Sequence, residues 1–159
     1  SFHENPKKII DVTPTLRTDE YAENDILFNK QEIPKAVKEE GGCSKLLNIT
    51  VNSEKATFKD LHVVLFQENQ SLDAAGDEIS VSAADGTAAK MLGWYSLTSG
   101  GNCDLGNFTT TNVGVITQVN PFLLQAASGS TSCYFIAILR DSAETYGADD
   151  LTFRFHIEY

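Results

Sequence analysis

The stretch LTFRFHIEY, residues 151–159, decides the fold class. Every second residue from Leu151 to Tyr159 is apolar, and the residues between them are polar or charged. Because successive side chains of a strand point to opposite faces, this alternation predicts a half-buried β-strand. Residues 47–52, LNITVN, repeat the pattern. Strands with one buried and one solvated face indicate an antiparallel β protein.

Two segments, LHVVLF at residues 61–66 and CYFIAIL at residues 133–139, are apolar on both faces. A strand of this kind is either covered on both sides within its own domain, or has one face in the core and the other against a neighbouring subunit. In the second case, the outer face of these two strands would be a contact between subunits.

Further strands are expected at residues 9–16, 25–28, 94–97 and 114–118, the last continuing into 122–125. Glycine-containing turns separate them, and short strands spaced in this way are typical of a sandwich or a jelly roll. One or two helical turns are expected at residues 82–92, with Ser82 as the N-cap. The sequence thus predicts a mainly β chain: an N-terminal arm over residues 1–8, and a single antiparallel β-sandwich or jelly-roll-like domain with one short helix over residues 9–159.

The charge balance narrows the choice of partner. The chain has 159 residues, a formal net charge of −10 and a pI near 4.6. Proteins that bind nucleic acid cluster Lys and Arg against phosphates, and the twelve basic residues here are scattered, so we expect no nucleic-acid partner. No apolar run approaches the ~18 residues of a membrane helix, and no membrane partner is expected.

Residue types that carry chemistry are present but dispersed along the chain. They are the histidines His3, His62 and His156 and the cysteines Cys43, Cys103 and Cys133. Their spacing matches no zinc motif, and neither a nucleophile elbow nor a phosphate-binding loop occurs. We expect free thiols, no cofactor, no metal, no catalytic residue and no enzymatic activity.

Aromatic residues offer one alternative. Trp94, Tyr95 and Tyr146 could form a platform for a sugar, which would make the chain a carbohydrate-binding β-sandwich module. Trp94 is close in sequence to Leu92 and Leu97, so we expect it to pack in a core instead.

Several phrases occur in a distinctive order along the chain. They are IDVTPTL (10–16), YA (21–22), DILF (25–28), EIPKAV (32–37), VLFQENQSL (64–72), ISVSAAD (79–85), GSTS (129–132) and YGA (146–148) before LTFR (151–154). This order resembles a group of small virion structural proteins of tailed bacteriophages, particularly marine ones. The likeness runs from about residue 10 to residue 159 and departs from the pattern at residues 5–8 and 100–112.

The resemblance implies a non-enzymatic virion structural protein, most similar to a capsid decoration, or cement, protein. Such proteins are made in the host bacterial cytoplasm, bind the major capsid protein on the outer capsid surface, commonly as homotrimers, and stabilise the capsid lattice. A tail, baseplate or fibre component is the alternative within the virion. The residues expected to contact a partner or another subunit are Phe2, His3, Lys7, Lys8, His62, Val64, Phe66, Tyr134 and Ile136.

Overall fold

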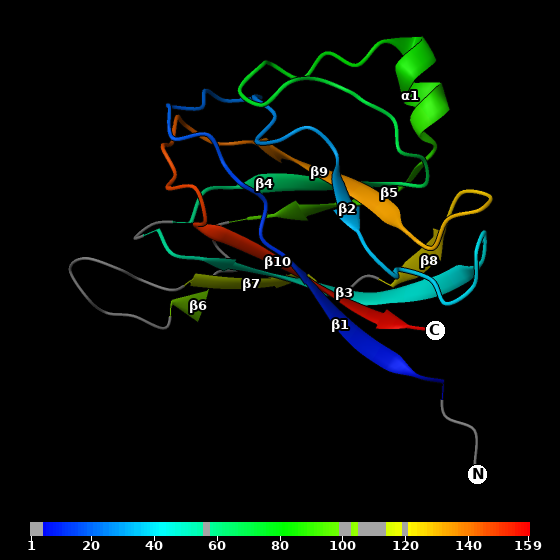
Figure 1. Cartoon of the computed structure of the whole chain (residues 1–159). Helices are drawn as coiled ribbons and strands as arrows, with labels where there is room; N and C mark the ends of the chain where they lie inside the picture. The colour runs from blue at the N-terminus through cyan, green and yellow to red at the C-terminus, as the bar shows by residue number, and fades with distance from the viewer. Residues whose placement is uncertain (1–4, 56–57, 99–102, 105–113, 119–120) are drawn as a thin grey trace.

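A computed structural model of the chain describes residues 5–55, 58–98, 103–104, 114–118 and 121–159 (Figure 1). The elements in chain order are β1 (Lys7–Val12), β2 (Gln31–Ile33), β3 (Cys43–Ser53), β4 (Leu61–Phe66), α1 (Ala83–Ala89), β5 (Met91–Leu97), β6 (Cys103–Asp104), β7 (Gly114–Gln118), β8 (Phe122–Gln125), β9 (Cys133–Leu139) and β10 (Leu151–Glu158). The chain is mainly β with one short helix, which confirms the predicted fold class.

The strands form two antiparallel sheets packed face to face. The larger sheet has the order β1-β10-β3-β7-β6, with β8 pairing with another part of β3, and the smaller sheet has the order β2-β9-β4-β5. Figure 1 shows the smaller sheet lying over the larger one, with α1 beyond the smaller sheet.

The strand pairs are nested along the chain. β4 pairs with β5, β3 pairs with β7 and β8 outside that pair, β2 pairs with β9, and β1 pairs with β10 outermost. An antiparallel hairpin folded over on itself in this way, with its pairs alternating between two sheets, is a jelly roll. Of the two architectures that the sequence left open, the strand order therefore selects the jelly roll.

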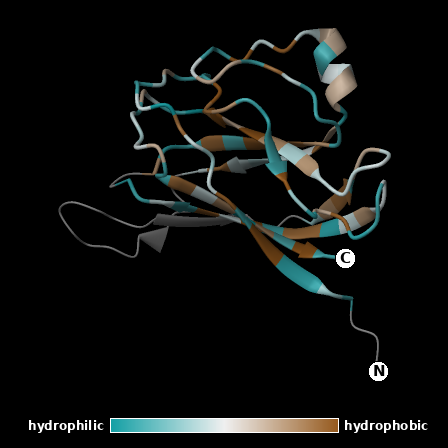
Figure 2. Cartoon of the chain, viewed as in Figure 1, coloured by the Kyte–Doolittle hydropathy of each residue, from teal (hydrophilic) through white to brown (hydrophobic). Residues whose placement is uncertain are grey.

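The core lies between the two sheets, where the alternation of β10 meets that of its neighbours. Phe153 and Phe155 are fully buried, and the ring of Phe135 from β9 lies 5.1 Å and 4.9 Å from them, edge to face. Edge-to-face packing suits the ring quadrupole and adds to the gain from burying apolar surface. In Figure 2, brown alternates with paler and teal residues along β10, as a half-buried strand requires.

The helix begins and ends as its sequence favours. Ser82 accepts a hydrogen bond from the Asp85 backbone N–H at 3.1 Å, which confirms it as the N-cap. Lys90, in the left-handed conformation, ends the helix, and Met91 begins β5. The expected helix was therefore too long, because Met91 pairs with Phe66 and Leu92 belongs to the same strand, β5. Within the described residues no helix is long and apolar enough to cross a membrane.

Other strand boundaries also differ from expectation. Residues 25–28 make only isolated bridges, Asp25 to Glu78 and Ile26 to Ile138, and are not a continuous strand. The first strand begins at Lys7 and ends at Val12, so its start lies within the expected arm. β2 and β6 have two or three residues each, too few for an alternating pattern to reveal them.

Candidate interaction surface

The outer face of the smaller sheet is the most unusual surface of the described chain. Val64 in β4 lies opposite Ile136 of β9 and Trp94 of β5, so these three side chains share the face that points away from the core. His62 and Phe66, two residues either side of Val64, lie on the same face. An outward sheet face with this composition is apolar where a free surface is normally polar.

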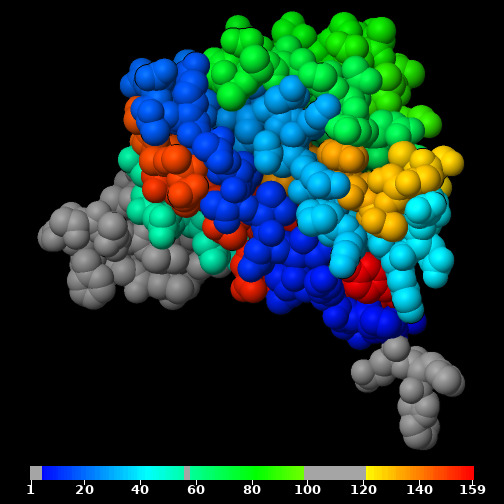
Figure 3. Space-filling view, in the orientation of Figure 1, coloured from blue at the N-terminus to red at the C-terminus, as the bar shows by residue number. Residues whose placement is uncertain are grey.

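Part of this face is covered by the chain itself. Ile136 and Phe66 are buried in a second apolar cluster together with Ile26, Ile138 and Ala89. The covering side chains come from Ile26 and from the segment of residues 67–90. Figure 3 shows this segment, in green, capping the molecule. The expectation of a face covered on both sides is thus met within the chain for this part.

The rest of the face is open. Trp94 is 51% exposed and Met91 is 60% exposed, and Val81 beside them is also exposed. Between the sheet and the covering segment runs a groove of about 310 Å³. Its lining is apolar: Val64, Phe66, Ile79, Val81, Gly86, Met91, Ile136 and Ile138. We call this open area, Trp94 together with the groove, the outer apolar face.

Trp94 is held in place by a histidine. The His62 ring centroid lies 4.9 Å from that of Trp94. Burial lowers the pKa of His62 below its ordinary value, and the positive charge of Arg140 lowers it further, against the opposing effect of Asp60. At neutral pH the imidazole is therefore uncharged, and the pair adds no charge to the outer apolar face.

The expectation that Trp94 packs in a core was wrong. Tyr95 and Leu97 are buried, and alternation along β5 places Trp94 on the opposite side. Tyr95 and Tyr146 are 2% and 3% exposed, so neither offers a ring to a sugar. The three aromatic residues consequently do not form a shared platform.

A second feature lies at the end of the sandwich where β1 begins and β10 ends. Three shallow hollows lie in this region, and Tyr159 borders two of them. Their rims hold five of the twelve basic residues of the chain: Lys7, Lys8, Lys35, Lys38 and Lys45. Glu158 is the carboxylate among the lining residues, and it pairs with Lys7 at 3.4 Å. We call this region the lysine end.

The structure divides the expected contact residues between these two surfaces. Lys7 and Lys8 lie in β1 at the lysine end, and His62 and Val64 lie on the outer apolar face. Tyr134 is half-buried on the same side of the sheet. Phe2 and His3 lie outside the described residues. Trp94 and Met91 were not among the contact residues expected from the sequence. Alternation along residues 91–97 nevertheless predicts that Trp94 lies on the other face of the strand from Tyr95 and Leu97.

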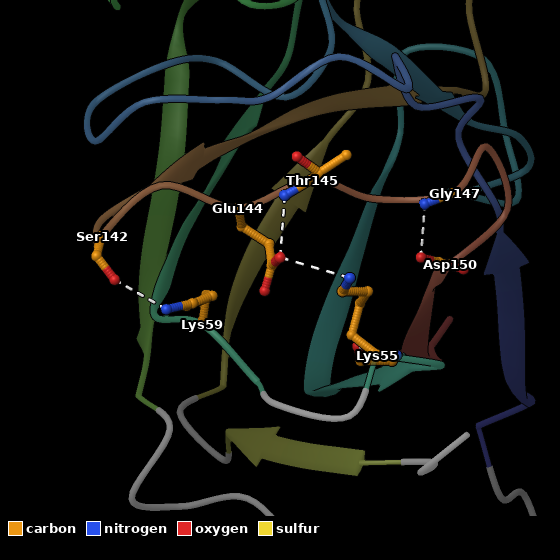
Figure 4. Close-up of polar contacts among 8 residues, drawn as sticks. Lys55, Lys59, Ser142, Glu144, Thr145, Gly147 and Asp150 are labelled. Carbon is orange, nitrogen blue, oxygen red and sulfur yellow. Dashed lines mark hydrogen bonds and ion pairs between the residues drawn. The ribbon is translucent and has the colours of Figure 1, made fainter. Parts of the chain in front are cut away.

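The opposite end of the sandwich is held together by polar contacts between two loops (Figure 4). Lys55 pairs with Glu144 at 3.5 Å, and Lys59 donates to the Ser142 hydroxyl at 2.8 Å. The Gly147 backbone N–H donates to the Asp150 carboxylate at 2.6 Å. These groups satisfy one another, which is the pattern of a structural junction.

The remaining reactive side chains of the described residues include two cysteines and a histidine. Burial raises the pKa of the Cys133 thiol to about 12, with a smaller contribution from the nearby Cys43, which is itself exposed at the start of β3. His156 on β10 lies within 3.1 Å of the Thr50 hydroxyl oxygen, and burial lowers its pKa. Across the described ranges, no three His, Cys, Asp or Glu side chains converge as metal ligands.

Comparisons with known proteins give limited information. No protein-family model matches the chain, and no curated protein matches it. Among solved structures, the crystal structure of tomato aspermy virus is similar to it with 14% sequence identity, covering 99% of this chain and 78% of that one, at a TM-score of 0.38. The assignment of the fold rests on the strand order described above.

Proposed function

We propose that this chain is a non-enzymatic structural protein of a virion, and that it acts as a capsid decoration protein on the outer surface of a phage head. The observation that carries the proposal is the outer apolar face. A contiguous exposed apolar patch often marks a site of interaction, so Trp94 together with the adjoining apolar groove favours a role in an assembly.

Two further features support this role. The ordered sequence phrases resemble virion proteins of tailed phages over most of the chain. The jelly roll is a fold that viral capsid domains use, although lectins and cupins use it as well, so the fold agrees with the role without selecting it.

The lysine end is the surface that we propose meets the major capsid protein. The chain carries a net charge of −10, yet five lysines concentrate at this end. A basic rim around apolar hollows fits an acidic surface, and such charges speed association and fix orientation. A partner that binds only the assembled lattice would stabilise it by mass action, repeated over many sites.

The test is the copy number and position of the chain in the particle, measured by quantitative mass spectrometry of virions and by cryo-electron microscopy. We expect a simple ratio to the major capsid protein, density on the outer head surface, and heads that break at lower temperature when the chain is absent. A few copies per virion located at the tail would contradict decoration and identify the chain as a tail, baseplate or fibre component.

Matched variants test the surface assigned to the lattice. The double variant Lys8→Glu, Lys38→Glu reverses two charges at the lysine end, and Lys59→Glu reverses one at the opposite end. In co-sedimentation with heads that lack the chain, the double variant should bind severalfold more weakly at low salt, and Lys59→Glu should bind as the unmodified chain does. Equal binding by both would exclude the lysine end as the contact.

A further inference from the structure

The outer apolar face presents a protruding side chain directly beside a groove. Trp94 is half exposed, and its ring lies against that of His62, with the two ring planes tilted by 54°. Val64, the cross-strand neighbour of Trp94, lines the groove, as does Met91 three residues before it. The protrusion and the groove therefore lie side by side on one surface.

The groove suits an indole in size and chemistry. Its volume is about 310 Å³, at the lower end of the ~300–1,000 Å³ range of small-ligand pockets. The side chains that line it are all aliphatic, aromatic or thioether, with Gly86 leaving a gap on the helix side. A flat apolar ring gains from such a site, whereas a charged group would lose its hydration there.

The shape of this face favours a second copy of this chain as the occupant, because the same surface carries both an exposed indole ring and an apolar groove that can receive one. Two molecules that each carry a net charge of −10 repel, and the repulsion is smallest where few charges face the contact. None of the side chains that line the groove is charged. Of the charges near it, Lys90 pairs with Glu68 at 3.3 Å, whereas Asp85 accepts from the neutral Gln70 amide at 3.2 Å and keeps its charge. His62 is neutral, because burial lowers its pKa.

We propose that two copies of the chain associate through this face about a two-fold axis, with Trp94 of each copy inserted in the groove of the other. A surface with adjacent, matching halves is self-complementary, which is the requirement for a two-fold contact. This proposal deepens the proposed function by assigning the outer apolar face to self-association and leaving the lysine end for the lattice. It gives pairs in place of the trimers that the resemblance implies.

Trp94 is the residue expected to dominate the contact. Buried tryptophans are among the commonest hot spots of interfaces, and truncating one typically weakens binding by a factor of at least about 30. Trp94 is also the single tryptophan of the chain, so its fluorescence reports directly on whether its ring is in water or in a groove.

The experiment follows the purified chain over a wide concentration range by sedimentation equilibrium and by tryptophan emission. We expect the mass to rise from one chain to two, and the emission maximum to shift to shorter wavelength over the same range. Added salt should strengthen the association, because it screens the repulsion between the two acidic chains. Weakening by salt would overturn an apolar contact.

Variants remove the protrusion and the groove separately. Trp94→Ala removes the ring, and Gly86→Leu fills the groove from α1. A Cβ at Gly86 meets its nearest atom, Val81 Cγ1, at an ordinary 3.7 Å, and both Leu and Ala favour helix over Gly. Gly86→Leu should therefore stay folded and sediment as a monomer, with its tryptophan emission fixed at the long-wavelength value. Gly86→Ala is the control, because it stabilises the helix similarly and leaves most of the groove open.

A mixture of the two variants tests the reciprocal geometry. Trp94→Ala keeps the groove, and Gly86→Leu keeps the ring. In a mixed pair, the ring of Gly86→Leu can therefore enter the groove of Trp94→Ala, whereas a pair of two identical variants has no insertion. We expect pairs in the mixture and monomers in each separate sample. Pairs that survive in both single variants, a chain that stays monomeric throughout, or a mass of three chains would each overturn the proposal. None of these results involves capsids, so the lattice-binding assay remains an independent test of the proposed function.

Discussion

Truncation of Phe135 is the most direct test of how the two sheets are held together. The side chain is fully buried in β9, and its ring meets three others edge to face: Phe28 at 5.4 Å, Phe153 at 5.1 Å and Phe155 at 4.9 Å. Phe→Ala changes in cores cost about 3–5 kcal/mol. Each aromatic pair adds about 0.5–1.5 kcal/mol beyond burial, so we expect Phe135→Ala to lie at the upper end, about 4–5 kcal/mol.

Urea unfolding followed by circular dichroism measures this loss. With a slope of about 2 kcal/mol per molar urea, a loss of 4 kcal/mol lowers the unfolding midpoint by about 2 M. Phe135→Leu keeps most of the apolar volume but loses the ring contacts, and should cost about 1–2 kcal/mol. Measurements at several protein concentrations separate unfolding from self-association.

Leu123→Ala is the matched control, because this β8 side chain is 60% exposed and its loss should cost under about 0.5 kcal/mol. If Phe135→Ala shifts the midpoint no more than Leu123→Ala does, the packing of β9 against β10 as described here is wrong.

Three further predictions concern single positions. Gly76 has a φ of +85°, and an added Cβ there would displace the Arg17 guanidinium, which donates to the Glu20 carbonyl and lies over the Tyr21 ring. Gly129 has a φ of +76° with open space around it. Gly76→Ala should therefore lower the melting temperature more than Gly129→Ala, whose cost is about 1–2 kcal/mol; equal losses would contradict the close contact. The lowered pKa of His62 means that the unfolded chain takes up a proton first as pH falls, so stability should be constant above about pH 6.5 and decline below it. Urea midpoints at about pH 7 and pH 5 should show a smaller difference for His62→Gln, and an unchanged difference would refute the assignment. Because burial raises the Cys133 pKa to about 12, iodoacetamide should modify Cys43 in the native chain and reach Cys133 only after unfolding; peptide mass mapping reads both sites, and similar native rates would contradict the burial.

Hydrophobic patterning predicted the central strands well, because the apolar side chains of these strands are the ones that are buried. β4 and β9 lie where the continuous apolar runs placed them, at Leu61–Phe66 and Cys133–Leu139, and β10 follows the pattern of its sequence. The short strands β2 and β6 escaped prediction because their pairing depends on a neighbouring strand and not on local pattern.

The candidate site was predicted in part. The excess of apolar residues on β4 and β9 correctly indicated a second apolar contact on the outer side of the sheet. Sequence alone could not show that the segment of residues 67–90 covers Phe66 and Ile136, because that contact joins residues distant in sequence. The prediction that Trp94 packs in the core was wrong because nearness in sequence to Leu97 does not place two residues on the same face of a strand. Leu97 points inward and Trp94 points outward.

The nesting of the strand pairs bears on how the chain folds. β4 and β5 form the innermost of the nested pairs, and pairing them closes a loop of moderate length. Each pair outside them closes a longer loop, which costs more conformational entropy. β10 lies between β1 and β3 in the larger sheet, and it carries the buried core residues Phe153 and Phe155. During synthesis, these partners of the core stay exposed to solvent until residue 158 has left the ribosome. Such a topology folds slowly and late, so a chaperone would meet a chain whose larger sheet is still open.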